Sequence, residues 1–196
     1  MRTGLMLRVF ILGGALSIMV WSVDAVAESF HVEAAKSQVR FQLGDPLHAV
    51  NGTFRVEKGD LAFTSHDRTM SGTIVVDARS GESGNGTRDR KMTDDELKAG
   101  QFSTVTFAPS RYTGMLAKSG ASTIMVEGVF TLLGTPHTIT VPMQVEIDGA
   151  RCTVTGSFPV PYVKWGLKDP SVLILRVGKE VTIRLGLVGS ISGAAA

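Results

Sequence analysis

The strongest structural signal in the chain lies at residues 122–147, which read STIMVEGVFTLLGTPHTITVPMQVEI. Apolar and polar residues alternate along His137–Ile147, and they alternate in the same way along Ser122–Leu132. A period of two is typical of strands that bury one face. The turn residues Gly134–Pro136 separate the two runs, so the stretch predicts an antiparallel β-hairpin. Pro142 removes one backbone donor from the second run, which predicts a strand edge or a bulge at that point.

Shorter runs with the same alternation lie on both sides of the hairpin. They predict strands at Gln38–Leu43, Thr53–Glu57, Asp60–Thr64, Met70–Asp77, Thr104–Ser110, Thr153–Phe158 and Val181–Leu187. No linker rich in Pro or Ser divides these runs, so one all-β domain is expected. A sheet of this size must protect its edges, either by closing into a barrel or by stacking as a sandwich. Alternation alone does not separate these two architectures.

Composition limits the functional classes that the chain can belong to. Of its 196 residues, 43% are apolar, which is enough for a packed core and argues against wholesale disorder. Twenty basic and eighteen acidic side chains give a net charge of +2 without a basic run, which argues against a nucleic-acid partner. The single cysteine, Cys152, excludes an internal disulfide framework and a thiolate metal cluster.

The N-terminal segment has the pattern of a secretory signal peptide. Arg2 and Arg8 precede the uncharged stretch Val9–Trp21, and Ala25–Ala27 supplies small residues around a cleavage site. We therefore expect a signal peptide at residues 1–27, with the β domain, which the family resemblance described below makes a β-barrel, at 28–190 and a flexible C-terminal tail at 191–196. An uncleaved membrane anchor is the alternative. The expected location is periplasmic or secreted, after cleavage near Ala27, where a lone cysteine is usually buried and inert.

One short helix interrupts the strand pattern. Thr93–Glu96 matches a capping box, which predicts a helix of little more than one turn at Asp94–Ala99. The preceding segment Ser80–Thr87 carries no apolar residue and is expected to be an exposed, mobile loop.

The chain lacks the motifs of common catalytic and metal sites. The four histidines, His31, His48, His66 and His137, have no metal-ligand spacing, and no Gly-x-Ser-x-Gly elbow, phosphate-binding loop or dinucleotide fingerprint is present. We therefore expect no cofactor, no metal and no enzymatic activity.

Several segments resemble the YceI-like family in order and spacing. They are Ser37–Phe41, Gly52–Phe54, Gly86–Met92, Phe102–Phe107 and Val126–His137. The resemblance covers nearly all of the chain from Glu28 to Leu187.

The chain also departs from the family pattern at a few positions. Lys36 stands where the family commonly has His, Arg90–Met92 where it has x-His-Leu, and Ser103 where it has Pro. The segment Tyr162–Ser171 is longer than the usual loop. The chain therefore resembles a divergent branch.

The resemblance implies an all-β fold, an extended, lipocalin-like antiparallel β-barrel of about eight strands with one or two short helices. It implies a periplasmic or secreted, non-catalytic carrier of a long-chain amphiphilic lipid, such as a polyisoprenoid, an isoprenoid quinone or a fatty lipid. Burying such a chain gains about 0.8 kcal/mol per CH₂.

Candidate ligand-contacting residues are those that alternation places with the apolar set, together with two aromatic residues in the Pro- and Gly-flanked segment Pro159–Pro170. They are Phe41, Phe54, Phe107, Ile124, Phe130, Met143, Phe158, Tyr162, Trp165 and Ile183. Ordinary core packing is the alternative role for each strand residue, and a loop that covers the barrel end is the alternative for Tyr162 and Trp165. Arg88 and Asp89 are expected to form a structural pair that fixes the helix, with a head-group contact as the alternative.

Two other functional classes stay open at this stage. An enzyme acting on a small lipid would use groups such as His48 or His137 at the barrel mouth. An interaction protein would present a strand edge or the Ser80–Thr87 loop to a membrane partner. The oligomeric state, including a homodimer, is also open, as is a transient contact with a membrane.

Overall fold

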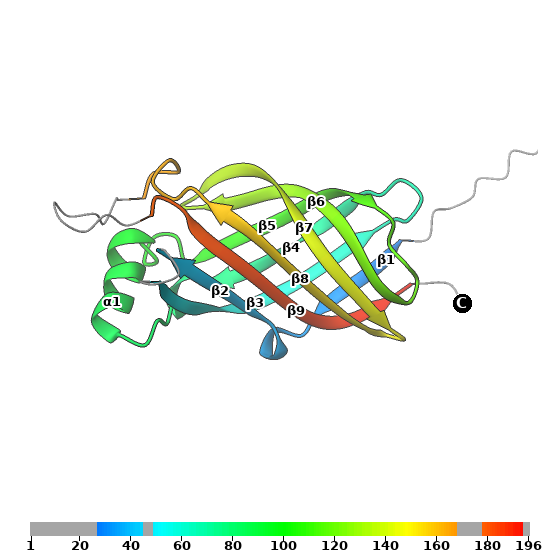
Figure 1. Ribbon diagram of the computed structural model, residues 1–196, viewed down its shortest axis with the longest axis horizontal. Coiled ribbons are helices and arrows are strands. Elements are labelled where there is room, and N and C mark those ends of the chain that lie inside the picture. Colours follow the sequence, from blue (N-terminus) through cyan, green and yellow to red (C-terminus); the bar gives the residue numbers. More distant parts are fainter. Residues whose placement is uncertain (1–26, 45–48, 168–177, 194–196) are drawn as a thin grey trace, which may run out of the picture.

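The computed structural model describes residues 27–44, 49–167 and 178–193. Within these ranges nine antiparallel strands form one continuous sheet that closes on itself (Figure 1). The strands are β1 (Glu28–Val32), β2 (Gln38–Leu43), β3 (Val50–Phe63), β4 (Met70–Asp77), β5 (Thr104–Gly114), β6 (Gly120–Leu132), β7 (Thr135–Asp148), β8 (Arg151–Val160) and β9 (Val181–Ser192).

The nine strands occupy eight positions around a closed barrel, because β1 and β2 lie end to end between β3 and β9. β2 pairs with the first part of β3 and of β9, and β1 pairs with the last part of each. The pairing of β3 with β4 completes the closure. This confirms the predicted all-β antiparallel barrel and excludes the sandwich.

The break between β1 and β2 is bridged by one buried hydroxyl. The chain makes a short 3₁₀ turn at Ala34–Lys36, and Ser37 follows it at 8% exposure. The Ser37 hydroxyl lies 2.9 Å from the carbonyl oxygen of Glu33, to which it donates, and it accepts from the backbone N–H of Val188 at 3.0 Å. The Ser37 hydroxyl therefore replaces backbone hydrogen bonds between strands that the 3₁₀ turn interrupts.

Replacing Ser37 by alanine is expected to lower the free energy of unfolding by about 1–3 kcal/mol, because the N–H of Val188 would be left without its partner. Urea denaturation measures this change. Ser190→Ala, at an exposed position of the same strand β9, is the matched control and should change stability by less than about 0.5 kcal/mol. Equal effects of the two substitutions would contradict the bridging role.

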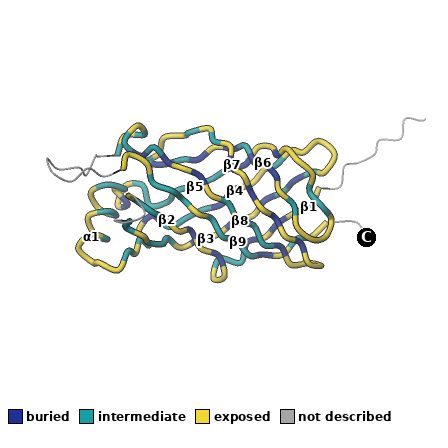
Figure 2. The backbone as a smooth tube through the Cα atoms, viewed as in Figure 1, coloured by how far each residue is buried: buried dark blue, intermediate teal, exposed yellow. Residues whose placement is uncertain are grey.

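Residues alternate between more and less buried positions along most of β6 and β7, and Figure 2 colours the backbone by this burial. The predicted hairpin is confirmed: β6 pairs with β7 along its whole length, from Gly120 opposite Ile147 to Leu132 opposite Thr135. The two strands predicted at Thr53–Glu57 and Asp60–Thr64 are one strand, β3, with an irregular register between Val56 and Lys58.

The N-terminal and C-terminal parts of the barrel differ from the prediction. β1 was not predicted, since only Phe30 and Val32 of its five residues are buried. β9 continues to Ser192, so Ile191 belongs to the barrel and not to a flexible tail. Ile191 lies opposite Phe30 of β1, so the end of β9 is held by a strand that the sequence did not reveal. Residues 1–26 and 194–196 lie outside the described residues.

The helix begins earlier than predicted. α1 (Gly86–Arg90) continues directly into a π-helical turn, η3 (Lys91–Glu96), and the side chain of Asn85 caps it by accepting from the N–H of Arg88 at 3.0 Å. The predicted capping box is wrong, because the Thr93 hydroxyl donates to the Asp89 carbonyl at 3.0 Å, one turn back within the helix. Together, α1 and η3 cover one end of the barrel (Figure 1). Among the described residues, no helix has the length and apolar character needed to cross a membrane.

Candidate functional site

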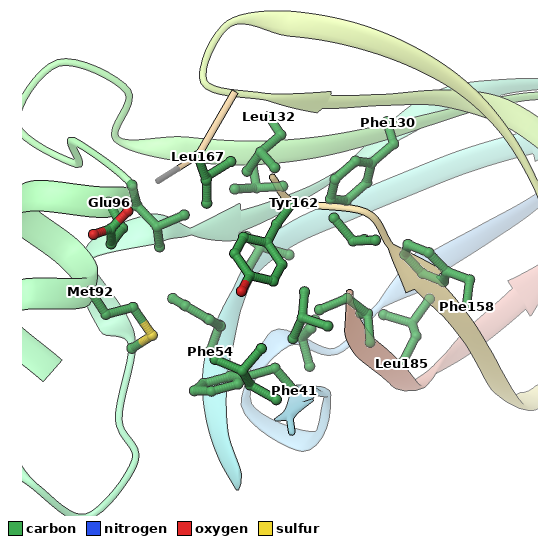
Figure 3. Close-up of a pocket in the computed structure, with 18 of the residues that line it drawn as sticks. Phe41, Phe54, Met92, Glu96, Phe130, Leu132, Phe158, Tyr162, Leu167 and Leu185 are labelled. Carbon is green, nitrogen blue, oxygen red and sulfur yellow. The ribbon is translucent and has the colours of Figure 1, made fainter. Parts of the chain in front are cut away.

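The barrel encloses a cavity of about 330 Å³ at the end that α1 covers; it is called the main cavity below. Nearly all of its wall comes from inward-facing aliphatic and aromatic side chains of the strands. Figure 3 shows Met92 and Glu96 reaching in from the helical cover, with Phe130 and Phe158 on the opposite side. Most of the polar lining comes from the helical cover and the segment before it, namely Ser83, Arg88, Lys91 and Glu96, and Thr106 of β5 adds a hydroxyl.

Aromatic pairs hold the wall of the main cavity. The ring centroids of Phe41 and Phe54 lie 5.5 Å apart, and those of Phe130 and Phe158 lie 5.7 Å apart, edge to face. The Phe41 ring lies directly over Gly52 on the paired strand, where a Cβ would collide with it. Glycine at this position therefore lets the ring lie flat against the wall and leaves the lumen free.

A second, smaller cavity of about 60 Å³ lies further along the barrel, toward β1; it is called the inner cavity below. It is lined by the far halves of the strands, including Phe30, Ile124, Cys152 and Leu187.

Most of the predicted ligand-contacting residues line the main cavity. These are Phe41, Phe54, Phe107, Phe130, Met143, Phe158, Tyr162 and Ile183. Ile124 lines only the inner cavity, because its place on β6 is nearer the β1 end. Trp165 lines neither cavity.

Trp165 instead covers a seam in the barrel wall. β7 pairs with β8 only from Met143 onward, so the predicted edge at Pro142 is confirmed as the point where this ladder ends. The indole of Trp165 stacks on the imidazole of His137 from β7, with ring centroids 4.0 Å apart. This stack fills the space that the missing ladder leaves, and Tyr162 and Leu167 of the same segment line the main cavity behind it.

Sequence reasoning missed the helical cover as part of the site. Arg88 does not pair with Asp89; both bind Ser83, with the Arg88 guanidinium donating to the Ser83 hydroxyl at 2.8 Å and carbonyl at 2.9 Å. Asp89 accepts from the N–H of Ser83 at 2.9 Å. The Asn85 cap three residues before Arg88 was the available signal for this helix. Ser83 thereby fixes the side chains that approach the cavity.

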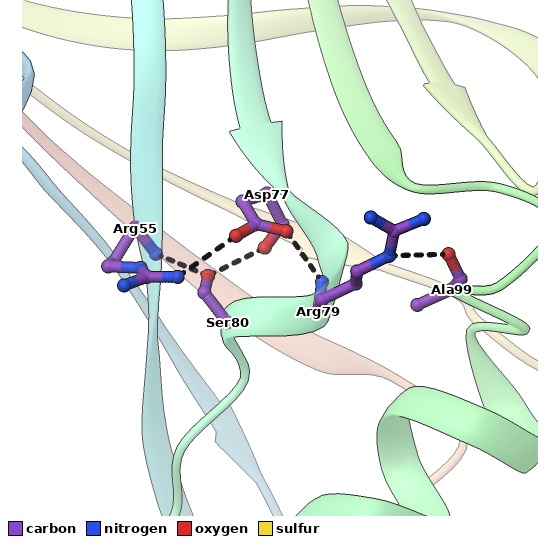
Figure 4. Close-up of polar contacts among 5 residues, drawn as sticks. All are labelled: Arg55, Asp77, Arg79, Ser80 and Ala99. Atoms are coloured by element: carbon purple, nitrogen blue, oxygen red, sulfur yellow. Dashed lines mark hydrogen bonds and ion pairs between the residues drawn. The ribbon is translucent and has the colours of Figure 1, made fainter.

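A second polar network ties the cover to the barrel rim (Figure 4). The side chain of Asp77, at the end of β4, accepts from the Arg55 guanidinium at 3.1 Å and from the N–H of Arg79 at 2.9 Å. The Arg79 side chain donates to the carbonyl of Ala99 at 3.2 Å. The Ser80–Thr87 segment is also attached, through paired backbone bonds between Glu82 and Thr53 of 2.8 and 3.0 Å. It is therefore not the free loop that was expected.

The titratable groups of the described residues form no cluster of metal-ligand type. No three His, Cys, Asp or Glu side chains in this part of the chain gather at a metal-binding arrangement. The Nε2 atom of His137 is buried under Trp165 without a hydrogen-bond partner among the described residues. His48 lies outside the described residues.

Cys152 is buried at 2% exposure, and desolvation raises the pKa of its thiol to about 11. Only about a thousandth of the thiol is ionised at pH 8, so the folded protein should react with an aromatic disulfide reagent at least about 100-fold more slowly than an exposed cysteine. Absorbance of the released thiolate measures the rate. Urea-unfolded protein is the control and should react at once; rapid reaction of the folded protein would contradict the burial of Cys152.

Comparisons with known proteins agree with this architecture. The crystal structure of BcnA from Burkholderia cenocepacia matches with a TM-score of 0.66 at 23% identity, covering 80% of this chain and 98% of that one. A polyisoprenoid binding domain from Saccharophagus degradans, implicated in plant cell wall breakdown, matches with a TM-score of 0.64 at 17% identity, covering 85% and 99%. The YceI protein of Campylobacter jejuni matches with a TM-score of 0.53 at 15% identity, covering 67% and 79%. At these identities the likeness concerns the fold.

None of the curated proteins matches the chain. The model of the YceI-like domain, in contrast, matches residues 30–188, which include almost the whole barrel and every residue named above as lining the main cavity. The chain therefore belongs to the YceI-like family.

Proposed function

We propose that this protein is a non-catalytic carrier that binds a long-chain amphiphilic lipid in its lumen. A polyisoprenoid, an isoprenoid quinone and a fatty lipid each combine a long apolar chain with a polar head group. The observation that carries the proposal is the main cavity, about 330 Å³ of space with an almost wholly apolar wall and polar groups at one end. This volume lies within the range of about 300–1,000 Å³ that is typical of ligand pockets. The polyisoprenoid binding domain of Saccharophagus degradans, which shares the fold, supports the same ligand class.

The energetics of burial favour a chain-like ligand. Each CH₂ that moves from water into the lumen gains about 0.8 kcal/mol, so ten of them gain about 8 kcal/mol. Estimates of the free-energy cost of association range over about 4–15 kcal/mol, so this gain is enough to offset the lower estimates. Affinity in such a site comes from the length of the chain and not from a single polar contact.

The polar lining gives the bound lipid a direction. Arg88, Lys91 and Glu96 lie at the end of the main cavity where the helical cover meets the strands. The two hydrogen bonds from Arg88 to Ser83 hold its guanidinium in a fixed orientation. The lipid head group would lie beside these side chains, with its chain pointing along the barrel toward β1.

This proposal also places the carrier outside the cytoplasm. The signal-peptide pattern at residues 1–27 supports a periplasmic or secreted protein. A water-filled compartment is where a long apolar chain needs a protein cover.

A chain-length series tests the proposal. Saturated fatty acids of about eight to about twenty carbons are allowed to displace a dansyl-labelled fatty acid from the purified protein, and fluorescence gives each dissociation constant. Each added CH₂ should strengthen binding by up to about fourfold until the lumen is filled. Dissociation constants that do not depend on chain length would contradict lipid binding in the lumen.

A further inference from the structure

The two cavities of the lumen share part of their lining. Four side chains line both the main cavity and the inner cavity, and they are Ile74, Phe107, Met143 and Leu185. They come from four different strands, β4, β5, β7 and β9. A set of side chains that contacts both spaces from several directions forms the layer that separates them.

The order of residues along β7 places this layer across the barrel axis. The inward-facing residues Val141, Met143 and Val145 follow one another on β7. Val141 lines only the main cavity, Met143 lines both cavities, and Val145 lines only the inner one. Successive inward-facing residues of β7 therefore pass from the main cavity to the inner cavity, so the two cavities follow one another along the barrel axis.

β9 repeats the same order on the other side of β8. Ile183 lines only the main cavity, Leu185 lines both, and Leu187 lines only the inner cavity. A chain that enters at the helical cover and runs along the barrel therefore reaches the inner cavity only past the shared layer.

Met143 differs from the other members of this layer in its freedom to move. Ile74 is branched at Cβ and stiff at its first torsion, Leu185 is branched, and Phe107 carries a rigid ring. Met143 is unbranched, has three rotatable bonds and fills irregular space readily. Its sulfur lies against Gly156 of β8, where a Cβ would collide with it, so the side chain occupies room that only glycine leaves free. A change of rotamer moves this side chain without moving a strand.

We propose that Met143 is an adjustable partition that sets the length of the lipid chain that the lumen accepts. The proposal rests on the lipid-binding function proposed above. Short chains fill the main cavity and stop at Met143, whereas longer chains displace it and enter the inner cavity. The ligand class is therefore a single-chain lipid long enough to pass the shared layer, with its head group at the helical cover.

The fatty-acid series, repeated with variants, tests this assignment. In the native protein, binding should tighten with each CH₂, then show a break where the chain meets Met143, and tighten only weakly beyond it. Met143→Ala should remove the break and strengthen binding of the longest acids at least about tenfold, with the shortest acids unchanged. Met92→Ala and Met70→Ala are matched controls, because Met92 lines only the main cavity and Met70 only the inner one. Both controls should leave the break at its native length.

The outcomes separate this inference from the proposed function. A native series that shows no dependence on chain length counts against lipid binding itself. A normal native series with an unchanged break in Met143→Ala, or an equal shift in Met92→Ala, overturns the role of Met143 alone. Met143→Leu keeps nearly the same volume and secures the test if the alanine variant does not fold. Its stiffer side chain should weaken binding of the longest acids about tenfold, and unchanged binding would overturn the inference.

Discussion

Replacing Val76 by tryptophan is expected to weaken lipid binding at least about 100-fold, equivalent to about 2.8 kcal/mol. Val76 lies on β4 near the helical cover, and its half-buried side chain lines the main cavity. An indole ring at this position would occupy space that the lipid chain needs. Displacement of the dansyl-labelled fatty acid measures the loss.

Val75→Trp is the matched control for this substitution. Val75 is the preceding residue on the same strand, pairs with exposed Lys58 on β3 and lines neither cavity. The same change of side chain should therefore leave affinity within about threefold of native. Comparable losses in the two variants would contradict a ligand site in the lumen and would point to a general effect on β4.

Replacing Gly72 by alanine is expected to lower the free energy of unfolding by about 2–5 kcal/mol. Gly72 has a φ of +100°, which L side chains rarely adopt, and an added Cβ would collide with the carbonyl oxygen of Asp60 on β3. The backbone strain costs about 1–2 kcal/mol, and the collision adds about 1–3 kcal/mol. Thermal or urea unfolding measures the sum.

Gly84→Ala separates the two causes. Gly84 has a similar φ of +80°, but no atom lies within 4 Å of an added Cβ. Only the strain contribution applies there, so we expect a loss of about 1–2 kcal/mol. If Gly84→Ala destabilised the protein as much as Gly72→Ala, the close contact between β3 and β4 would not be the reason for glycine at position 72.

The strands of the barrel were predictable where burial imposes a period of two. β7 carries four buried residues at alternate positions, from Val141 to Ile147, and this pattern is visible in the sequence without any knowledge of its partners. β1 is too short to show this pattern clearly, because only Phe30 and Val32 are buried in it, and the strand is held by its pairing with β3 and β9. Short strands held by their neighbours carry little signal of their own.

The candidate site was predictable in kind but not in detail. Alternation places Ile124 and Ile183 on the inside of the barrel equally well, yet Ile183 lines the main cavity and Ile124 only the inner one. Which level of the barrel a residue occupies depends on the register between strands, which a single sequence does not contain. The stack of Trp165 on His137 depends likewise on the end of the β7–β8 ladder.

Native mass spectrometry tests the central claim most directly. The protein is purified from its own cellular compartment without detergent and measured before and after extraction with organic solvent. A carrier with an occupied lumen should show a discrete mass above that of the polypeptide, which disappears on extraction and reappears as a single-chain amphiphilic lipid in the extract. A polypeptide that carries no added mass, and that takes up no lipid when mixed with vesicles of total membrane lipid, would contradict the proposed lipid-binding function.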